Sequence, residues 1–382
     1  MNMRNPFLVG GYVSAKYFCD REYETAELIR KVTNGNNLVL ISPRRMGKTG
    51  LIDHCFANPI LAKTYNTFYV DIYATSSLKE FVFKMGKEIF ETLKPKGKKI
   101  IERFFAIITS LRPAFKLDEI TGNPVFDIGM GEIRTAEFTL EEIFNYLEAA
   151  DKQCIVAIDE FQQIEKYPEE NIEALLRTYV QRCKNVVFIF AGSRRHIMQN
   201  IFFSSSRPFY QSAVLLNLEV IDKEKYTRYV INKFSEAHKK ISFELIGKIY
   251  ELFEGYTWYM QVIFNEVFSL LDKGDICTIN DIEISLKNRI VSYEKIFLTT
   301  LSLLPERQKE LLYAIAKDGK ATNITSGDFV KKHSLLSSAS VQTSAKQLLD
   351  KEIITSENKV YQVYDRFFGL WLKTAFGTGY RL

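Results

Sequence analysis

One short segment of the chain combines glycine, lysine and threonine in an order that binds phosphate groups. Gly47, Lys48 and Thr49 follow the apolar run 37–41, and Ser42 stands where such a loop usually carries its first glycine. Gly47 lets the backbone approach a phosphate, Lys48 supplies a mobile positive charge, and the Thr49 hydroxyl is an oxygen ligand that suits Mg²⁺. Because the first glycine mainly serves the turn out of the strand, serine can replace it. The predicted phosphate-binding loop comprises Ser42, Pro43, Arg44, Arg45, Met46, Gly47, Lys48, Thr49 and Gly50.

A second polar group consists of two adjacent carboxylates. Asp159 and Glu160 follow the apolar run 153–158. Where a phosphate-binding loop hydrolyses a nucleotide, a carboxylate in this position holds Mg²⁺, and its neighbour can take a proton from the attacking water. Two acids at a strand end can also be a solvated edge, but the loop in the same chain disfavours that interpretation. We therefore predict Thr49 and Asp159 as metal-binding residues and Glu160 as the general base.

Further polar residues follow the next apolar run, 185–191. Ser193 stands where a hydroxyl could contact a γ-phosphate or a water, whereas Arg194 and Arg195 are either site residues or charges on a helix surface. Arg207 is the one charged residue in the stretch 206–210. It could stabilise transition-state charge, in cis or across a subunit boundary, or form a salt bridge within the fold. The predicted catalytic residues are Lys48, Glu160, Ser193 and Arg207.

The elements that must position these residues are strands with almost no polar interruption. Such strands are usually buried on both faces, as in a parallel sheet covered by helices. Helical patterns lie between them, over 77–93, 139–150 and 171–183. The strands are predicted at 37–41, 67–72, 153–158 and 185–191. The pattern predicts a doubly wound α/β domain with a parallel sheet.

One segment departs from this alternation of strands and helices. Residues 113–118 and 124–128 alternate between apolar and polar side chains around Gly122. This pattern predicts a β-hairpin inserted near 113–128. It could be a surface for a partner or an insertion without a function of its own.

The chain changes character after the α/β region. Amphipathic helical patterns dominate residues 221–300, which we interpret as a helical lid domain. Within 301–382 three helices precede two short strands, an arrangement typical of a winged helix-turn-helix. The predicted domains are therefore a nucleotide-binding core at 1–220, the lid at 221–300 and the winged helix at 301–382.

Composition narrows the classes of protein that fit. No apolar run reaches the roughly 20 residues that span a bilayer, and the first residues lack the apolar stretch of a signal peptide. The five cysteines are scattered without CxxC spacing, which indicates reduced thiols rather than a disulfide frame or metal site. We expect a cytoplasmic protein with no membrane partner. The net charge is +5, and residues 290–382 carry thirteen Lys or Arg against nine Asp or Glu.

Several segments together resemble the archaeal-type ATPase family within the AAA+/STAND group of P-loop proteins. They are Phe18-Cys19-Asp20-Arg21-Glu22, the loop 43–49, Ile158-Asp159-Glu160-Phe161-Gln162 and Gly192-Ser193. The resemblance covers nearly the whole chain and implies an ATPase core, a helical lid and a C-terminal winged helix. It also implies that Asp20 and Arg21 lie near the adenine, with Asp20 where glycine is usual. Segment 255–261 is similar to the family's lid motif, with Thr257 replacing proline, and 364–371 is similar to the way these chains end.

These observations predict a protein that binds ATP with Mg²⁺ and hydrolyses it at low turnover. The first hypothesis is a nucleotide-driven switch that acts through the winged helix on an unidentified protein partner. The alternative is a DNA-binding AAA+ type ATPase, a loader or regulator, whose winged helix contacts duplex DNA. The predicted recognition helix carries Ser338, Ser340, Gln342, Thr343 and Lys346, without an arginine cluster. A homo-oligomer is left open, while GTP use and a small-molecule kinase are disfavoured.

Overall fold

The computed structural model of the protein describes residues 5–93, 97–111, 115–117, 124–126 and 135–375. The chain forms two compact units. One unit is Gly10–Ile221, and the other combines Met1–Val9 with Asp222–Leu382. Within the part of the chain that the structure describes, none of the helices combines the length and apolar character that a membrane crossing requires.

A five-stranded parallel sheet forms the centre of the unit Gly10–Ile221. Its order is β2-β5-β6-β1-β7. Every residue of β1, β5 and β6 is buried, which explains why these strands read as unbroken apolar runs. The strands are β1 (Leu38–Ile41), β2 (Asn66–Asp71), β5 (Cys154–Asp159), β6 (Val186–Gly192) and β7 (Val214–Asn217). The predicted parallel sheet is confirmed, and β7 is an additional edge strand too short for its sequence to distinguish it from a loop.

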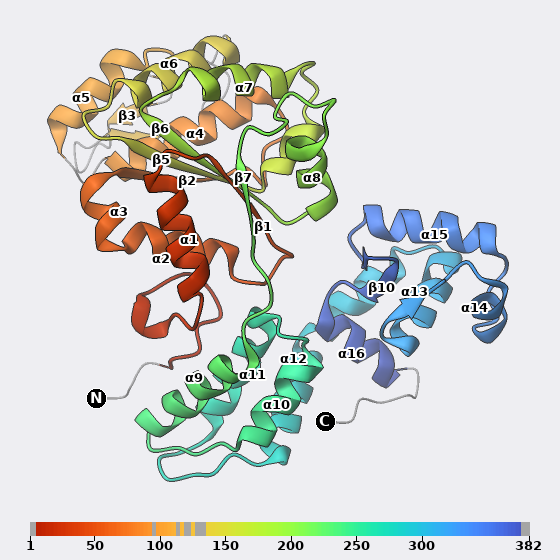
Figure 1. Cartoon of the computed structure of the whole chain (residues 1–382). Coiled ribbons are helices and arrows are strands. Elements are labelled where there is room, and N and C mark those ends of the chain that lie inside the picture. The colour runs from red at the N-terminus through yellow and green to blue at the C-terminus, as the bar shows by residue number, and fades with distance from the viewer. Residues whose placement is uncertain (1–4, 94–96, 112–114, 118–123, 127–134, 376–382) are drawn as a thin grey trace. The chain divides into compact units, whose positions relative to one another are not determined.

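Helices cover both faces of this sheet. In Figure 1, α6 and α7 lie on one side of the sheet, and α1, α2 and α3 lie on the other. This is the doubly wound arrangement that the sequence predicts. The α-helices are α1 (Glu22–Thr33), α2 (Lys48–Ala57), α3 (Pro59–Thr64), α4 (Leu78–Leu93), α5 (Lys98–Ile107), α6 (Ala136–Glu148), α7 (Ile172–Arg182) and α8 (Arg195–Phe203); η1 (Ala15–Tyr17) and η5 (Phe161–Lys166) are 3₁₀ helices.

An aromatic cluster fixes the turn that follows β5. Phe161, the first residue of η5, packs against Phe190 of β6 with ring centroids 4.7 Å apart. Phe202 and Phe209 contact both rings, and all four side chains are fully buried. Aromatic pairs at such distances stabilise beyond the area they bury. The end of β5 is therefore held firmly against β6, where the predicted carboxylates and Ser193 lie.

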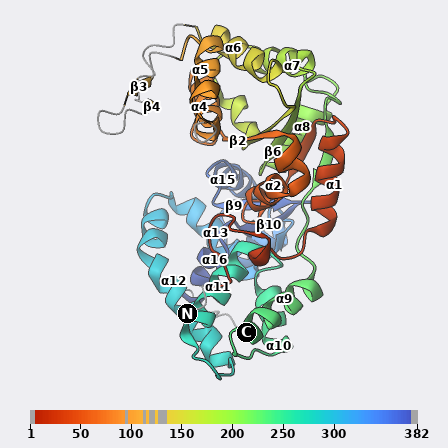
Figure 2. The same ribbon diagram turned by 90° about the vertical axis from the view of Figure 1, so that its left-hand side faces the viewer.

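The inserted hairpin consists of β3 (Phe115–Leu117) and β4 (Pro124–Phe126). The two strands are antiparallel, with Phe115 opposite Phe126. Figure 2 shows the pair standing apart from the helices of its unit. The remainder of the predicted hairpin, including its turn at Gly122, lies outside the described residues.

Four helices begin the C-terminal part of the other unit. They are α9 (Lys223–Glu236), α10 (Phe243–Leu252), α11 (Thr257–Leu270) and α12 (Ile279–Ser302). Side chains of Asp222, Ser242 and Thr278 cap three of them by accepting hydrogen bonds from backbone N–H groups. The first three of these helices lie within 221–300, the region for which the sequence predicts helices, and α12 extends two residues beyond it, to Ser302.

The N-terminal segment packs against these helices. Phe7 is fully buried and contacts Phe234 and Phe264, both at 5.6 Å between ring centroids. The Asn265 amide donates to the Phe7 carbonyl at 2.6 Å. The sequence predicts one domain over 1–220, whereas the segment before Gly10 groups with the helical region, where Phe7 packs among aromatic side chains.

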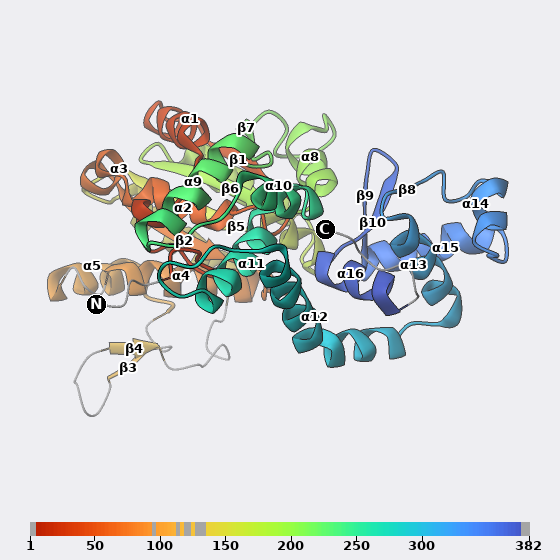
Figure 3. The ribbon, with the colours of Figure 1, turned by 90° about the horizontal axis from the view of Figure 1, so that it is seen from below.

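The winged helix begins after α12, which runs from the helical region toward α13 (Figure 3). Its small sheet has the order β8-β10-β9, and β9 and β10 pair antiparallel, with Ile354 opposite Val363. Asn358 and Lys359, which join them, both have positive φ, as a two-residue hairpin turn of matching twist requires. The elements are α13 (Glu306–Asp318), β8 (Ala321–Thr322), α14 (Gly327–Lys332), α15 (Ser338–Asp350), β9 (Ile354–Glu357), β10 (Val360–Val363) and α16 (Arg366–Ala375).

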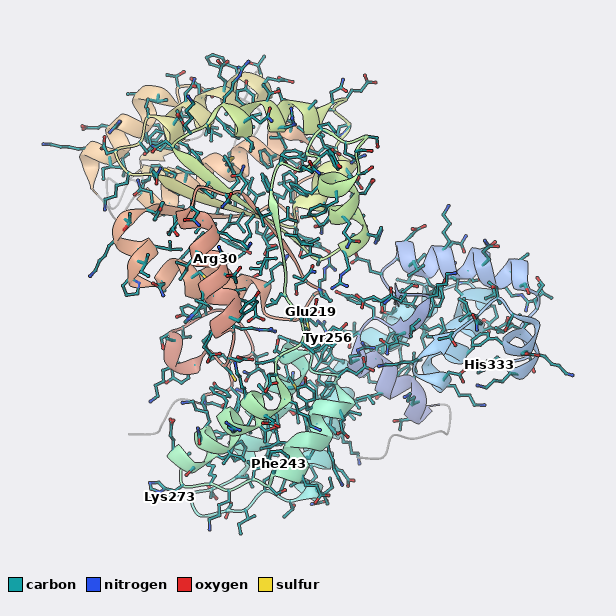
Figure 4. The ribbon with its side chains drawn as sticks, viewed as in Figure 1. Arg30, Glu219, Phe243, Tyr256, Lys273 and His333 are labelled. Carbon is teal, nitrogen blue, oxygen red and sulfur yellow. The ribbon has the colours of Figure 1, made fainter. Side chains whose placement is uncertain are left out.

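The lid motif 255–261 and the tail 364–371 lie against each other. The Arg366 guanidinium donates to Glu254 at 3.1 Å and lies 4.9 Å from the ring centre of Tyr256, which is labelled in Figure 4. The Arg366 backbone N–H donates to the Tyr259 hydroxyl at 3.1 Å, and the rings of Phe367 and Tyr259 are 5.2 Å apart. The tail therefore joins the winged helix to the turn between α10 and α11.

Candidate functional site

The predicted phosphate-binding loop connects β1 to α2. Ser42 is fully buried, its backbone N–H donates to the Gly192 carbonyl at 3.2 Å, and its hydroxyl donates to the Pro43 carbonyl at 2.9 Å. Arg45 has φ +70°, and Gly47, the residue that precedes α2, has φ +91°. Glycine suits this position because L side chains rarely adopt that conformation. The loop thus ends at the N-terminus of a ten-residue helix.

Lysine and threonine of the loop meet the two predicted carboxylates. The Lys48 ammonium contacts Asp159 Oδ1 and lies 3.1 Å from Glu160 Oε1. The Thr49 hydroxyl donates to Asp159 Oδ2 at 3.1 Å. Lys48 and Asp159 are only 7% and 4% exposed, so their charges interact with little screening by water. Four residues predicted from separate segments are therefore brought into one group.

Ser193 joins this group through Glu160. Its hydroxyl donates to Glu160 Oε2 at 2.7 Å, and the Gln162 amide donates to the same oxygen. Glu160 itself has φ +57°, an uncommon conformation for a residue other than glycine. We call Lys48, Thr49, Asp159, Glu160 and Ser193 the phosphate-site cluster. Gln162 lies in the segment 158–162 that resembles the ATPase family, but its position two residues after Glu160 does not by itself predict this contact.

Tyr69 also contacts this cluster, although its sequence position does not suggest it. It lies on β2, beside β5, and its hydroxyl donates to Asp159 Oδ2 at 2.5 Å. The same hydroxyl is 3.4 Å from the Thr49 hydroxyl. A tyrosine in a strand pattern is more often a core residue than a site residue, so the sequence offers only the strand order as a signal.

The charges of the cluster fix the protonation state of Asp159. Burial acts to raise the pKa of Asp159, but the Lys48 charge and the hydrogen bonds from Lys48, Tyr69 and the Glu160 backbone outweigh it and hold the pKa below its ordinary value. Burial and the Asp159 charge raise the pKa of Tyr69 well above its ordinary value. At neutral pH Asp159 is therefore a carboxylate, and Tyr69 is a neutral hydrogen-bond donor.

The oxygen atoms of the cluster suit a metal that arrives with a nucleotide. Among the described residues, no group of three or more His, Cys, Asp or Glu could hold a metal ion by itself. Mg²⁺ is usually bound by one or two protein oxygens together with substrate phosphates and waters. Thr49, Asp159 and Glu160 provide hard oxygen atoms beside the N-terminus of α2, which favours anions. This set fits Mg²⁺ bound together with a phosphate-bearing ligand.

The two residues assigned to the adenine by resemblance precede α1. Asp20 and Arg21 have φ of +56° and +75°, and Arg21 is 4% exposed. The Arg21 guanidinium donates to Glu24 at 2.7 Å, which fixes it against the first turn of α1. Arg21 is therefore buried and held by an ion pair. That Asp20 and Arg21 contact the adenine base stays a prediction.

Of the other arginines named from the sequence, Arg44, Arg195 and Arg207 have partners in the same unit. Arg44 lies 5.0 Å from the centre of the Tyr73 ring, and Arg195 lies 3.6 Å from Glu219. Arg207 donates to Glu165 at 2.6 Å and also contacts Glu173. Arg207 therefore forms a salt bridge within the fold, one of the two roles that the sequence allows. Its two carboxylate partners, Glu165 and Glu173, are not members of the phosphate-site cluster.

Replacement of Arg207 by alanine is expected to destabilise the fold in a pH-dependent way. Burial raises the pKa of Glu173, Arg207 opposes that rise and the Glu165 carboxylate adds to it. The net effect is a raised pKa even with Arg207 present, and without Arg207 it would rise further, so the loss of stability in the variant grows as pH rises. We expect a loss of about 1–3 kcal/mol near neutral pH and a smaller loss near pH 5, measured by thermal unfolding.

The double variant R207A/E173Q is the matched control for this prediction. It removes the carboxylate that R207A leaves without its partner, so the pH dependence of the penalty should disappear. If R207A unfolds like the wild type but loses nucleotide hydrolysis, Arg207 acts in catalysis instead of in this ion pair.

Comparisons with known proteins agree on the architecture. A family profile described as an ATPase domain predominantly from Archaea matches residues 18–263, and one described as a probable winged helix domain matches 295–374. The Walker-type ATPase paby2304 of Pyrococcus abyssi has a similar structure, with a TM-score of 0.67, 18% identity, and coverage of 96% of this chain and 99% of that chain. No curated protein matches the chain significantly.

Two proteins of Aeropyrum pernix share the same fold. The ORC2 protein, solved as ADPNP-ADP complexes, has a TM-score of 0.60, 12% identity, and coverage of 98% of this chain and 99% of that chain. The ORC1 protein, solved in complex with DNA, has a TM-score of 0.52, 12% identity, and coverage of 97% and 96%. At sequence identities of 12–18%, these structural comparisons show a shared fold only. With the profile match over most of its length, the chain belongs to the family of ATPase domains found predominantly in Archaea, and it carries a C-terminal winged helix.

Proposed function

We propose that the chain binds ATP with Mg²⁺, hydrolyses it at low turnover and uses the nucleotide state as a switch. The observation that carries this proposal is the convergence of Lys48, Thr49, Asp159, Glu160 and Ser193. A lysine for phosphate, a hydroxyl and a carboxylate for a metal, and a second carboxylate beside a hydroxyl are the parts that phosphoryl transfer to water needs.

The charge balance of the cluster supports a requirement for metal. Two carboxylates, Asp159 and Glu160, share the single ammonium of Lys48. ATP would bring further negative charge to the same place, so it has to compete with both carboxylates for Lys48. Bound Mg²⁺ would supply the missing positive charge and polarise the phosphate oxygens. Thr49 and Asp159 would hold it, because their oxygens already face one another.

Glu160 is the proposed general base and Ser193 its partner. Glu160 Oε2 accepts hydrogen bonds from Ser193 and Gln162, so both side chains orient the carboxylate. In the role that we assign, Glu160 takes a proton from a water while Ser193 holds that water or a γ-phosphate oxygen. Asp20 and Arg21 are proposed to lie beside the base of the nucleotide. A role for Arg207 in stabilising transition-state charge, in cis or from a neighbouring subunit, is also retained as a proposal.

The switch itself has a direct test. If ATP and ADP change the C-terminal unit differently, backbone amides of α9–α12 should exchange with solvent at different rates in the two states. We expect the difference in hydrogen exchange to vanish in the Lys48→Ala variant at nucleotide concentrations that saturate the wild type but not the weakened variant. Identical exchange with ATP and ADP, both shown to be bound by the wild type, would contradict the switch.

The alternative is a DNA-binding ATPase of the AAA+ type, and one observation favours it. On α15, Ser338, Gln342, Thr343 and Lys346 are exposed, so a polar face is available to phosphates and base edges. Binding to duplex should then be strong at low salt and fall steeply as salt rises. Failure to retain the protein on duplex DNA at low salt would leave a protein partner as the target of the winged helix.

We propose that this activity takes place in the cytoplasm. None of the five cysteines forms a disulfide, all five lying in described residues, and Cys55, Cys154 and Cys277 are buried. Reduced thiols agree with the proposed location in the cytoplasm. Whether the ATPase works alone, as STAND-type proteins can before they are triggered, or as a homo-oligomer is part of the same proposal.

A further inference from the structure

The hydroxyl of Tyr69 completes a full set of donors around the Asp159 carboxylate. Oδ1 accepts from Lys48 and from the Glu160 backbone N–H, which is 2.8 Å away. Oδ2 accepts from Thr49 at 3.1 Å and from Tyr69 at 2.5 Å. Each oxygen therefore has two donors, which fixes the rotation of the carboxylate. Lys48 and Thr49 belong to the phosphate-binding loop and Glu160 is the next residue after Asp159, so Tyr69 is the one of these four donors that comes from a different strand.

The position of Tyr69 follows from the order of the sheet. β2 is the edge strand, and it pairs with β5 in parallel so that Asp71 lies opposite Asp159 and Tyr69 opposite Ala157. The tyrosine side chain spans this two-residue offset and reaches Asp159 at the carboxyl end of β5.

A purely structural interpretation is that Tyr69 fills space at the sheet edge. In that case the ring would matter and the hydroxyl would not. The hydroxyl, however, lies within hydrogen-bonding distance of both residues to which we assign the metal, Thr49 and Asp159.

We propose that Tyr69 is a positioning residue for the metal: by holding the Asp159 carboxylate in register with Thr49, its hydroxyl determines how tightly the chain binds Mg²⁺ together with ATP. The inference rests on the proposed ATPase site. Partners that orient metal ligands typically change metal affinity by roughly 10- to 100-fold when they are removed. In this protein the orienting contact is the hydrogen bond from the Tyr69 hydroxyl on β2 to Asp159.

The test is the Tyr69→Phe variant, which keeps the ring and removes the hydroxyl. Binding of a fluorescent ATP analogue is measured in EDTA and across a titration of free Mg²⁺. We expect Tyr69→Phe to need roughly 10- to 100-fold more free Mg²⁺ for half of the metal-dependent gain in affinity, with affinity in EDTA unchanged. The control is Tyr65→Phe, a buried tyrosine next to β2, which should behave as the wild type in both conditions.

The other outcomes separate this inference from the proposed function. If wild-type affinity for the analogue does not respond to Mg²⁺, the proposed metal site itself is wrong. If the wild type responds and Tyr69→Phe has the same Mg²⁺ requirement, only the role of Tyr69 is overturned. Two results would show that the hydroxyl is merely structural. One is that Tyr69→Phe also binds the analogue more weakly in EDTA. The other is that its loss of affinity is accompanied by a lower unfolding temperature.

Discussion

Replacing Lys48 with alanine is expected to weaken ATP binding by about 2–3 kcal/mol, which is roughly 30- to 150-fold. Lys48 is the one cation of the phosphate-site cluster, and it contacts both Asp159 and Glu160. Without it, two carboxylates would face the phosphates with no ammonium between them. The measurement is calorimetric titration of the variant with ATP in the presence of Mg²⁺.

Two further variants make this result specific to the charge. Lys48→Met keeps most of the buried stem and should lose binding to a similar extent, so packing is excluded as the cause. Lys63→Ala removes an exposed lysine of α3 and should bind as the wild type does. Wild-type affinity in Lys48→Ala would mean that the nucleotide does not sit at this loop.

Replacing Glu160 with glutamine is expected to keep ATP binding and to lower turnover by about 100- to 10,000-fold. Glutamine has nearly the same shape, and its carbonyl oxygen can still accept a hydrogen bond from Ser193 or Lys48. It cannot accept a proton from water. The measurement is steady-state phosphate release, with calorimetric titration to show that binding survives.

The matched control for this variant lies on η5, five residues further along the chain. Glu165→Gln makes the same chemical change in a carboxylate that pairs with Arg207 and contacts no member of the phosphate-site cluster in the contacts described. It should hydrolyse ATP at the wild-type rate. If Glu160→Gln turns over normally, Glu160 is not the base.

The sequence predicted the core of the site because parallel strands place their carboxyl ends at one edge of the sheet. The loop 42–50 and the residues Asp159, Glu160 and Ser193 each follow a buried strand, and β1, β5 and β6 are neighbours in the sheet. Their side chains therefore had to converge. Local sequence patterns were enough here, because the three strands that precede these residues are adjacent in the sheet.

Residues whose roles depend on distant partners could not be predicted in this way. Arg207 has its carboxylates at Glu165 and Glu173, more than thirty residues away, and its sequence surroundings contain no charge. Tyr69 reads as a core residue of a strand, and its contact with Asp159 exists only because β2 is next to β5. Phe7 packs in the helical unit, although it precedes the ATPase region in the chain, because its ring contacts Phe234 and Phe264 there.

The contacts of the segment 364–371 could not be predicted from the sequence either. The resemblance to the ATPase family points to this segment but gives it no role. In the structure Asp365 caps α16 by accepting from the Phe367 backbone N–H at 2.9 Å, and Arg366 reaches Glu254 in the turn before α11. An ion pair between residues 112 positions apart leaves no local trace in the sequence.

Phosphate release from a single turnover is the most direct test of the central claim, which is that the phosphate-site cluster hydrolyses ATP with Mg²⁺. Protein in excess over ATP is mixed with Mg²⁺ or with EDTA, and bound nucleotide and free phosphate are followed together for the wild type, Lys48→Ala and Glu160→Gln. We predict that the wild type converts its bound ATP to ADP and phosphate only with Mg²⁺, that Lys48→Ala binds far less ATP at the same concentrations, and that Glu160→Gln holds ATP unconverted. Bound ATP that the wild type leaves intact in Mg²⁺, or cleaves equally well in EDTA, would contradict the account.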